Sequence, residues 1–232
     1  MAALRPLGHH GRAQTRRRQE GQPDRARPRR HGDGGVRLGV LGGSFDPVHL
    51  GHLGLAAAAH DQAYLDRLIF VPAGYQWRKA DRRMAPAGER CEMVRLAIAG
   101  NPHFGLATLE VEREGPSYSD VTLEALKEDR PDAELVFILG RDALADLPNW
   151  HAPERVLELA TLAVAGRAGD GGPAPSEELP GGLRGRVIWL DMPPVNVSAT
   201  DVRERVRAGR SIEGLVPDAV REYIAAENLY RD

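Results

Sequence analysis

Short apolar runs alternate along the chain with longer stretches of helical character. The run Leu135-Val136-Phe137-Ile138-Leu139 is almost continuous, which is typical of a central parallel strand covered on both faces. We expect strands at 36–41, 67–71, 104–111, 135–139, 161–165 and 187–190, and helices at 50–60, 89–99, 119–127, 202–208 and 217–226, with short helices from 141 and from 153. This alternation predicts an α/β fold, doubly wound around a mostly parallel, Rossmann-like sheet.

Ligands of such sheets bind at the carboxyl ends of the strands. Three segments of this chain are candidates by position: those that follow the first strand, Leu139 and Leu190. The sequence therefore predicts one site built from segments far apart in the chain.

Composition indicates an ordinary globular protein of 232 residues, with 42% hydrophobic and 28% charged residues. Cys91 is the one cysteine, so an internal disulfide is impossible, and we expect a cytoplasmic protein. No apolar run approaches the length of a membrane span, so we expect no membrane partner.

Charge divides the chain into two parts. Residues 1–35 contain nine arginines against three acidic residues and almost no aliphatic residues after Leu7, which predicts a disordered Arg-rich extension. The extension is either a basic arm or an unused upstream segment, and the second interpretation is favoured. Residues 36–232 carry 22 basic against 30 acidic residues, which argues against nucleic acid as a partner. We expect 36–232 to form a single domain with a flexible loop near 166–186.

The segment 42–52, Gly-Gly-Ser-Phe-Asp-Pro-Val-His-Leu-Gly-His, stands between the first expected strand and an Ala- and Leu-rich helix. Backbone N–H groups and the helix dipole favour phosphate binding at such a junction. His49 and His52 share one face of the helix start, where imidazoles can donate hydrogen bonds to phosphate oxygens that gain charge in a transition state. The plainer interpretation is a tight turn with two surface histidines.

Later segments contain further candidate groups. Ser198 or Thr200 can cap a late helix whose free N–H groups hold phosphate, and Arg203 lies one turn further on. The other three segments are Trp77-Arg78-Lys79 in a polar loop, 115–123 (Gly-Pro-Ser-Tyr-Ser-Asp-Val-Thr-Leu), and 140–151, which begins Gly-Arg-Asp-Ala-Leu and ends Trp-His.

Together these segments resemble the HxGH nucleotidyltransferase superfamily and, within it, the bacterial nicotinate-mononucleotide adenylyltransferases. The resemblance spans 38–230 and departs from the family pattern at Arg78, Arg141 and Ala199. It implies a nucleotidyltransferase fold, with His49, His52, Lys79 and Arg203 as catalytic residues. It implies ATP contacts from Gly42, Gly43, Ser44, Phe45, His49, His52, Gly140, Asp142, Ser198, Thr200 and Arg203, and mononucleotide contacts from Tyr118, Ser119, Trp150 and Lys79.

The activity implied by the resemblance is transfer of AMP from ATP to nicotinate mononucleotide, which gives deamido-NAD and pyrophosphate in NAD biosynthesis. Magnesium is expected to enter with ATP, because no side-chain cluster resembles a dedicated metal site. The alternatives are an adenylyltransferase that acts on nicotinamide mononucleotide and a non-catalytic nucleotide sensor of the same fold. The sequence leaves the oligomeric state open, a homo-oligomer included.

Overall fold

Six parallel strands form one sheet in the computed structural model, which describes residues 35–75, 84–165, 185–193 and 195–231. The strand order is β3-β2-β1-β4-β5-β6. The strands are β1 (Arg37–Gly43), β2 (Arg67–Pro72), β3 (Phe104–Leu106), β4 (Glu134–Leu139), β5 (Ala160–Ala165) and β6 (Val187–Leu190). The strand order turns back between β1 and β4, which is where open α/β sheets bind their ligands.

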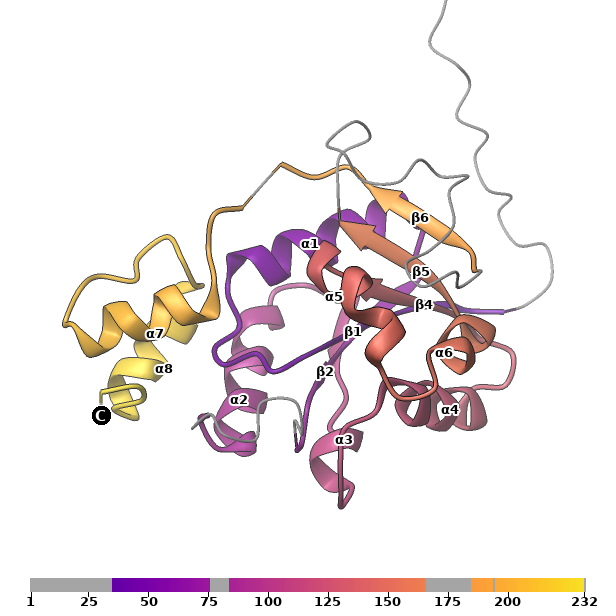
Figure 1. Ribbon diagram of the computed structural model, residues 1–232. Coiled ribbons are helices and arrows are strands. Elements are labelled where there is room, and N and C mark those ends of the chain that lie inside the picture. The colour runs from indigo at the N-terminus through magenta and orange to yellow at the C-terminus, as the bar shows by residue number, and fades with distance from the viewer. Residues whose placement is uncertain (1–34, 76–83, 166–184, 194, 232) are drawn as a thin grey trace, which may run out of the picture. The chain divides into compact units, whose positions relative to one another are not determined.

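Helices cover both faces of this sheet, so the predicted doubly wound fold is confirmed (Figure 1). Buried residues of α1, α2, α7 and α8 join one core cluster, and buried residues of α4, α5, α6 and the short 3-10 helix η2 join the other. The helices are α1 (Leu50–Gln62), α2 (Ala87–Ile98), α3 (Leu109–Glu112), α4 (Ser119–Asp129), α5 (Arg141–Asp146), η2 (Leu147–Asn149), α6 (Pro153–Leu159), α7 (Ala199–Arg207) and α8 (Asp218–Ala226).

Strand β4 shows why its sequence is apolar at every position. Val136 and Ile138 face the first core cluster, whereas Leu135, Phe137 and Leu139 face the second. Because side chains alternate between the faces of a strand, a strand with helices on both sides buries all of them. All five residues are less than 5% exposed.

The prediction of a strand over 104–111 is wrong beyond its first three residues. Strand β3 pairs with β2 through Phe104–Leu106 alone, and α3 follows. Pro72 ends β2 and has no N–H with which to extend the ladder. The chain instead turns so that the backbone of Glu110 approaches Gly74, where an added Cβ would lie 2.0 Å from the Glu110 carbonyl oxygen.

Helix α7 begins at Ala199, earlier than the expected start at 202, because the Ser198 side chain caps it. Figure 1 shows α7 and α8 beyond the carboxyl ends of β5 and β6. These two helices therefore lie toward the end of the sheet at which a ligand is expected.

Three predictions concern residues outside those that the structure describes. They are the Arg-rich extension, of which 1–34 are not described, the loop near 166–186, of which 166–184 are not described, and Lys79 with its neighbours Trp77 and Arg78. Within the described parts of the chain, no helix combines the length and the apolar character that crossing a bilayer requires.

Candidate active site

The turn after β1 is built around a buried phenylalanine. Phe45 is fully buried in the left-handed region, at φ 47°, and its ring packs edge-on against His52 with ring centroids 5.0 Å apart. The same ring lies under Gly43, where an added Cβ would approach it to 3.1 Å. Because Gly43 has no Cβ, the Phe45 ring has room to pack against His52.

His49 and His52 form a stacked pair at the start of α1. Their ring centroids are 3.7 Å apart, with an interplanar angle of 26°. The backbone N–H of His49 donates to Nδ1 of His52 at 3.2 Å. Because Nδ1 is the acceptor, a neutral His52 carries its proton on Nε2, so it is a donor at its other nitrogen.

The two histidines differ in exposure. His49 is 8% exposed, and burial lowers its pKa from 6.5 to about 4, so this ring is neutral at physiological pH. Its Nδ1 has no hydrogen-bond partner within the described residues. His52 is only partly buried. The structure therefore places His52 nearer to solvent and His49 behind it.

Gly51 leaves the space that the His49 ring occupies. A Cβ at this position would lie 3.0 Å from Nδ1 of His49, 3.1 Å from its Cε1 and 3.3 Å from Cγ1 of Val197. Both neighbours are held, since His49 is the N-cap residue of α1 and Val197 precedes α7. An alanine at position 51 would therefore force the His49 ring or Val197 to move by a few tenths of an ångström.

Asp46 is the buried centre of an interaction network that joins four segments. The carboxylate is 2% exposed, and its Oδ1 accepts hydrogen bonds from the Ala85 N–H at 3.1 Å and the Tyr230 hydroxyl at 2.9 Å. Arg203 donates to the backbone oxygen of Asp46, and its Nη1 lies 3.6 Å from Oδ2. The turn is therefore held by residues that are distant in sequence.

Arg90 of α2 holds the same turn from another side. Its side chain is 1% exposed, and it donates to the carbonyl oxygens of Ser44 at 2.8 Å and Ala85 at 3.0 Å. Burial lowers the pKa of Arg90, and the nearby Asp46 carboxylate opposes that shift. The signal in the sequence was a charged residue on the apolar face of α2, one turn before Met93, and it was missed.

Arg203 is 7% exposed, and besides its contacts with Asp46 it donates to Oγ1 of Thr200 at 3.0 Å. Its described contacts are thus with the protein, while the expected contact with phosphate stays a prediction. Asp46 and Tyr230 were not among the predicted site residues. Asp46 lies inside the 42–52 segment, where its sequence context is that of an ordinary turn residue, and no local signal marks Tyr230.

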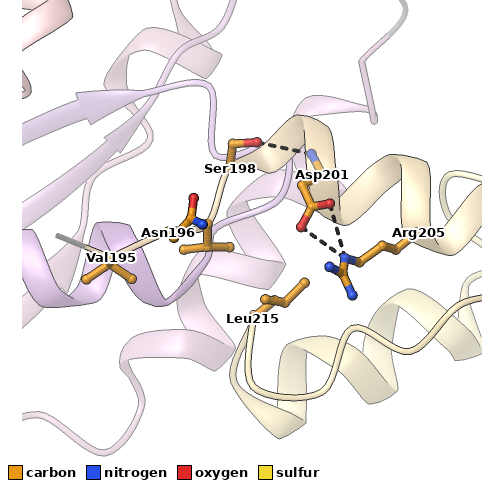
Figure 2. Close-up of a pocket in the computed structure, with 7 residues that line it drawn as sticks. Val195, Asn196, Ser198, Asp201, Arg205 and Leu215 are labelled. Carbon is orange, nitrogen blue, oxygen red and sulfur yellow. Dashed lines mark hydrogen bonds and ion pairs between the residues drawn. The ribbon is translucent and has the colours of Figure 1, made fainter.

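A pocket of about 440 Å³ opens at the N-terminus of α7, lined by Val195, Asn196, Val197, Ser198, Asp201, Arg205 and Leu215. Figure 2 shows the Ser198 hydroxyl accepting from the Asp201 N–H at 3.1 Å, and the Asp201 carboxylate paired with Arg205. Ser198, rather than Thr200, is therefore the cap residue. Val197 lies beside Gly51, where an added Cβ would come within 3.3 Å of its Cγ1, so the pocket lies close to the start of α1.

The segment after β4 places Gly140 at the N-cap of α5 and leaves Asp142 exposed in its first turn. Trp150 follows η2 and is partly buried. Its indole N–H donates to Oδ2 of Asp146 at 3.2 Å, and its ring meets Phe137 edge-on at 6.1 Å. Trp150 thus packs against the core while keeping part of its surface exposed.

The segment 115–122 is fastened to the end of β2 and to α3. The Gly74 N–H donates to the Ser117 hydroxyl at 2.9 Å. Thr122 donates to the buried carboxyl of Glu110 at 2.6 Å, and burial raises the pKa of Glu110 against the lowering effect of hydrogen bonds from Thr122 and Ser117. Ser119 begins α4, whose N-cap is Tyr118. Glu110 is a further residue that sequence reasoning missed.

Three of the predicted segments begin at the same edge of the sheet. The turn with His49 and His52 follows β1, Gly140 and Trp150 follow β4, and the α7 N-terminus follows β6. Parallel strands direct these ends to the same edge. Among the described residues, no group of three or more His, Cys, Asp or Glu side chains is arranged to hold a metal ion.

This fold and site define a nucleotidyltransferase, and comparisons with known proteins agree. The sequence profile described as cytidylyltransferase-like matches residues 40–205. The probable nicotinate-nucleotide adenylyltransferase of Thermomicrobium roseum is 44% identical over 197 residues, covering 84% of this chain and 92% of that protein. Its counterpart from Roseiflexus sp. is 45% identical over 196 residues, covering 84% and 98%. The chain belongs to the cytidylyltransferase-like family, in its nicotinate-nucleotide adenylyltransferase branch.

Solved structures give the same fold at low sequence identity. The nicotinic acid mononucleotide adenylyltransferase of Plasmodium falciparum, complexed with NaAD, is 19% identical, covers 84% of this chain and 97% of its own, and has a TM-score of 0.70. The nicotinate-nucleotide adenylyltransferase of Vibrio parahaemolyticus, described as putative, is also 19% identical, covers 85% and 96%, and has a TM-score of 0.62.

Proposed function

We propose that this enzyme transfers AMP from ATP to nicotinate mononucleotide, giving deamido-NAD and pyrophosphate in NAD biosynthesis. The observation that carries the proposal is the stacked His49–His52 pair at the start of α1. This pair follows β1, next to the place where the strand order reverses between β1 and β4. Relatives more than 40% identical over most of this chain support the choice of substrate.

The reaction is an in-line displacement at the α-phosphorus of ATP. A phosphate oxygen of the mononucleotide forms the new P–O bond as the bond to pyrophosphate breaks, and the electron pair leaves with pyrophosphate. The nucleophile is already an anion, so no general base is required, and catalysis consists of positioning and charge stabilisation.

His52 is the residue to which we assign the main transition-state hydrogen bond. Its Nδ1 accepts from the His49 N–H, and its Nε2–H can donate to an oxygen of the transferring phosphate. His49 supports this ring by stacking, and its low pKa keeps it uncharged. The glycine-rich end of β1 and the N-terminus of α7 supply backbone N–H groups for the other phosphates.

Lys79 and Arg203 are assigned to the departing pyrophosphate. Arg203 also orders the catalytic turn through Asp46. A divalent ion accompanies ATP, and we propose magnesium. The described residues form no carboxylate cage, so the ion's ligands would be mostly phosphate oxygens and water, where it offsets phosphate charge. On the side of the mononucleotide we assign Tyr118, Ser119 and Trp150. We also infer a cytoplasmic location, from the single cysteine.

Pyrophosphate release from ATP and magnesium, with nicotinate or nicotinamide mononucleotide offered in turn, tests the proposal. We expect deamido-NAD from the first substrate and a much lower kcat/KM with the second. His52→Ala should lower kcat by about a hundredfold or more, with a smaller change in ATP affinity. No product from either mononucleotide would favour a nucleotide sensor, and preference for the amide would reverse the substrate assignment.

A further inference from the structure

His151 links the two segments that flank the proposed mononucleotide site. Its Nδ1 lies 2.9 Å from Oδ2 of Asp120, and its ring stacks on Tyr118 with centroids 4.2 Å apart and an interplanar angle of 12°. Asp120 and Tyr118 stand at the start of α4, whereas His151 directly follows Trp150. The three residues, called here the Asp120–His151–Tyr118 bracket, therefore join α4 to the Trp150 segment.

Within this bracket Asp120 is buried, whereas His151 is exposed to solvent. Asp120 is 4% exposed and lies in the first turn of α4, where the helix dipole favours a carboxylate. Its Oδ1 has no hydrogen-bond partner within the described residues. The His151 side chain is 50% exposed. A buried carboxylate of this kind is costly without a donor, so the His151 Nδ1–H is fixed in direction.

An exposed imidazole held in this way can set the plane of its neighbour. The tyrosine ring of Tyr118 lies nearly parallel to His151, so the ring face of His151 limits the rotamers open to Tyr118. Ala152, the next residue, has φ 42°, so the chain turns sharply just after the bracket. The position of Trp150 is therefore coupled to the start of α4 through its neighbour.

We propose that His151 is a positioning residue for the pyridine mononucleotide, acting through Tyr118 and the Trp150 segment. This inference rests on the proposed function and adds to it a residue outside the motif positions assigned above. The hydrogen bond to Asp120 sets the ring, and the ring in turn orders Tyr118 beside the substrate.

Three variants separate the two contacts of His151. His151→Asn places an amide donor near the position of Nδ1, so it keeps the partner of Asp120 but loses the stacked ring. His151→Phe keeps a ring and removes the donor, and His151→Ala removes both. His103→Ala is the matched control, because His103 is also an exposed histidine, precedes β3 and has its ring against His60, not against the bracket.

Stability and substrate affinity should respond to different contacts. We expect His151→Asn to keep a Tm close to that of the parent, yet to raise the KM for nicotinate mononucleotide about fivefold or more, on the scale of a lost stacking contact. His151→Phe should lower Tm, because Asp120 loses its donor. The KM for ATP should change less than twofold in His151→Asn, and His103→Ala should match the parent.

A second comparison tests whether His151 acts through Tyr118. If it does, adding His151→Asn to Tyr118→Ala should raise the KM for the mononucleotide no further than Tyr118→Ala alone, because contacting residues are not additive. Full additivity would overturn this route, and a KM that simply follows Tm across the three variants would show a purely structural role.

Failure of the proposed function is distinguishable from failure of the bracket. If the parent formed no dinucleotide, the assigned activity would be wrong. Calorimetric titration of parent and variants with nicotinate mononucleotide would then still compare affinities without turnover. Weaker binding by His151→Asn at unchanged Tm supports the bracket, and equal binding, or no binding by the parent, overturns it.

Discussion

The hydroxyl of Tyr230 donates a hydrogen bond of 2.9 Å to Oδ1 of Asp46, a residue 184 positions earlier in the chain. Burial, followed by the Asp46 charge and this hydrogen bond, raises the pKa of Tyr230 far above its ordinary value. The segment after α8 is thereby tied to the turn that holds the histidine pair. A contact from the C-terminal segment thus contributes to the geometry of the proposed catalytic turn.

Tyr230→Phe should destabilise the protein and lower turnover together. The variant removes one donor to a buried carboxylate, a hydrogen bond worth about 1.5–3 kcal/mol when one partner is charged. Tyr223→Phe is the matched control, since its hydroxyl donates to a carboxylate, that of Glu89, and not to Asp46. Chemical denaturation and kcat measured on both variants test this. Equal kcat values for the two variants would contradict a role of Tyr230 in the turn.

Gly51→Ala should lower kcat strongly, because its Cβ would displace the His49 ring or Val197 by several tenths of an ångström. Gly88→Ala is its counterpart, since Gly88 is also the second residue of a helix and has no atom within 4 Å of an added Cβ. The control should be neutral or slightly stabilising, as alanine favours helices over glycine by up to about 1 kcal/mol. Steady-state kinetics and Tm, measured for both glycine variants, test this prediction. Turnover like the parent's in Gly51→Ala would refute the packing argument.

The low pKa of His49 predicts a stability that depends on pH. The pKa is about 4 in the folded protein, against an ordinary value of 6.5 in the unfolded chain. Between these values the unfolded chain binds more protons, so stability from this group is complete above pH 6.5 and is lost as the pH falls toward 4.

Denaturant unfolding of the parent and of His49→Asn at several pH values between 4 and 7 measures this effect. The parent should lose more stability than the variant as the pH falls. NMR titration of the His49 ring is a direct check, and a midpoint near that of free histidine would show that burial does not act on this ring.

Trp150→Ala should raise the KM for the mononucleotide about fivefold to a hundredfold, on the scale of one aromatic stacking contact, and change the KM for ATP much less. It should also lower stability, because the indole packs on Phe137 and donates to Asp146. Trp150→Phe keeps an aromatic face and loses the donor, so its KM should lie nearer to the parent's. If Trp150→Ala were destabilised and its two KM values rose together, Trp150 would not stack on the mononucleotide.

Local sequence was enough to predict the architecture and the position of the histidine pair. The apolar run Leu135–Leu139 and the alternation of strands and helices determine a doubly wound sheet, because each face must be covered. The segment from Gly42 to His52 predicted a strand-to-helix junction, since glycines and an N-terminal helix turn are local properties of the chain.

Only the tertiary structure determined which buried residues hold the catalytic turn in place. Arg203 was expected to face phosphate, and in the fold it contacts Thr200 and the buried Asp46, which Tyr230 also contacts. The length of β3 was likewise decided by its partner, because Pro72 cannot extend the ladder. Such contacts join residues far apart in the chain, and no local periodicity or motif spacing encodes which buried donor will meet which acceptor.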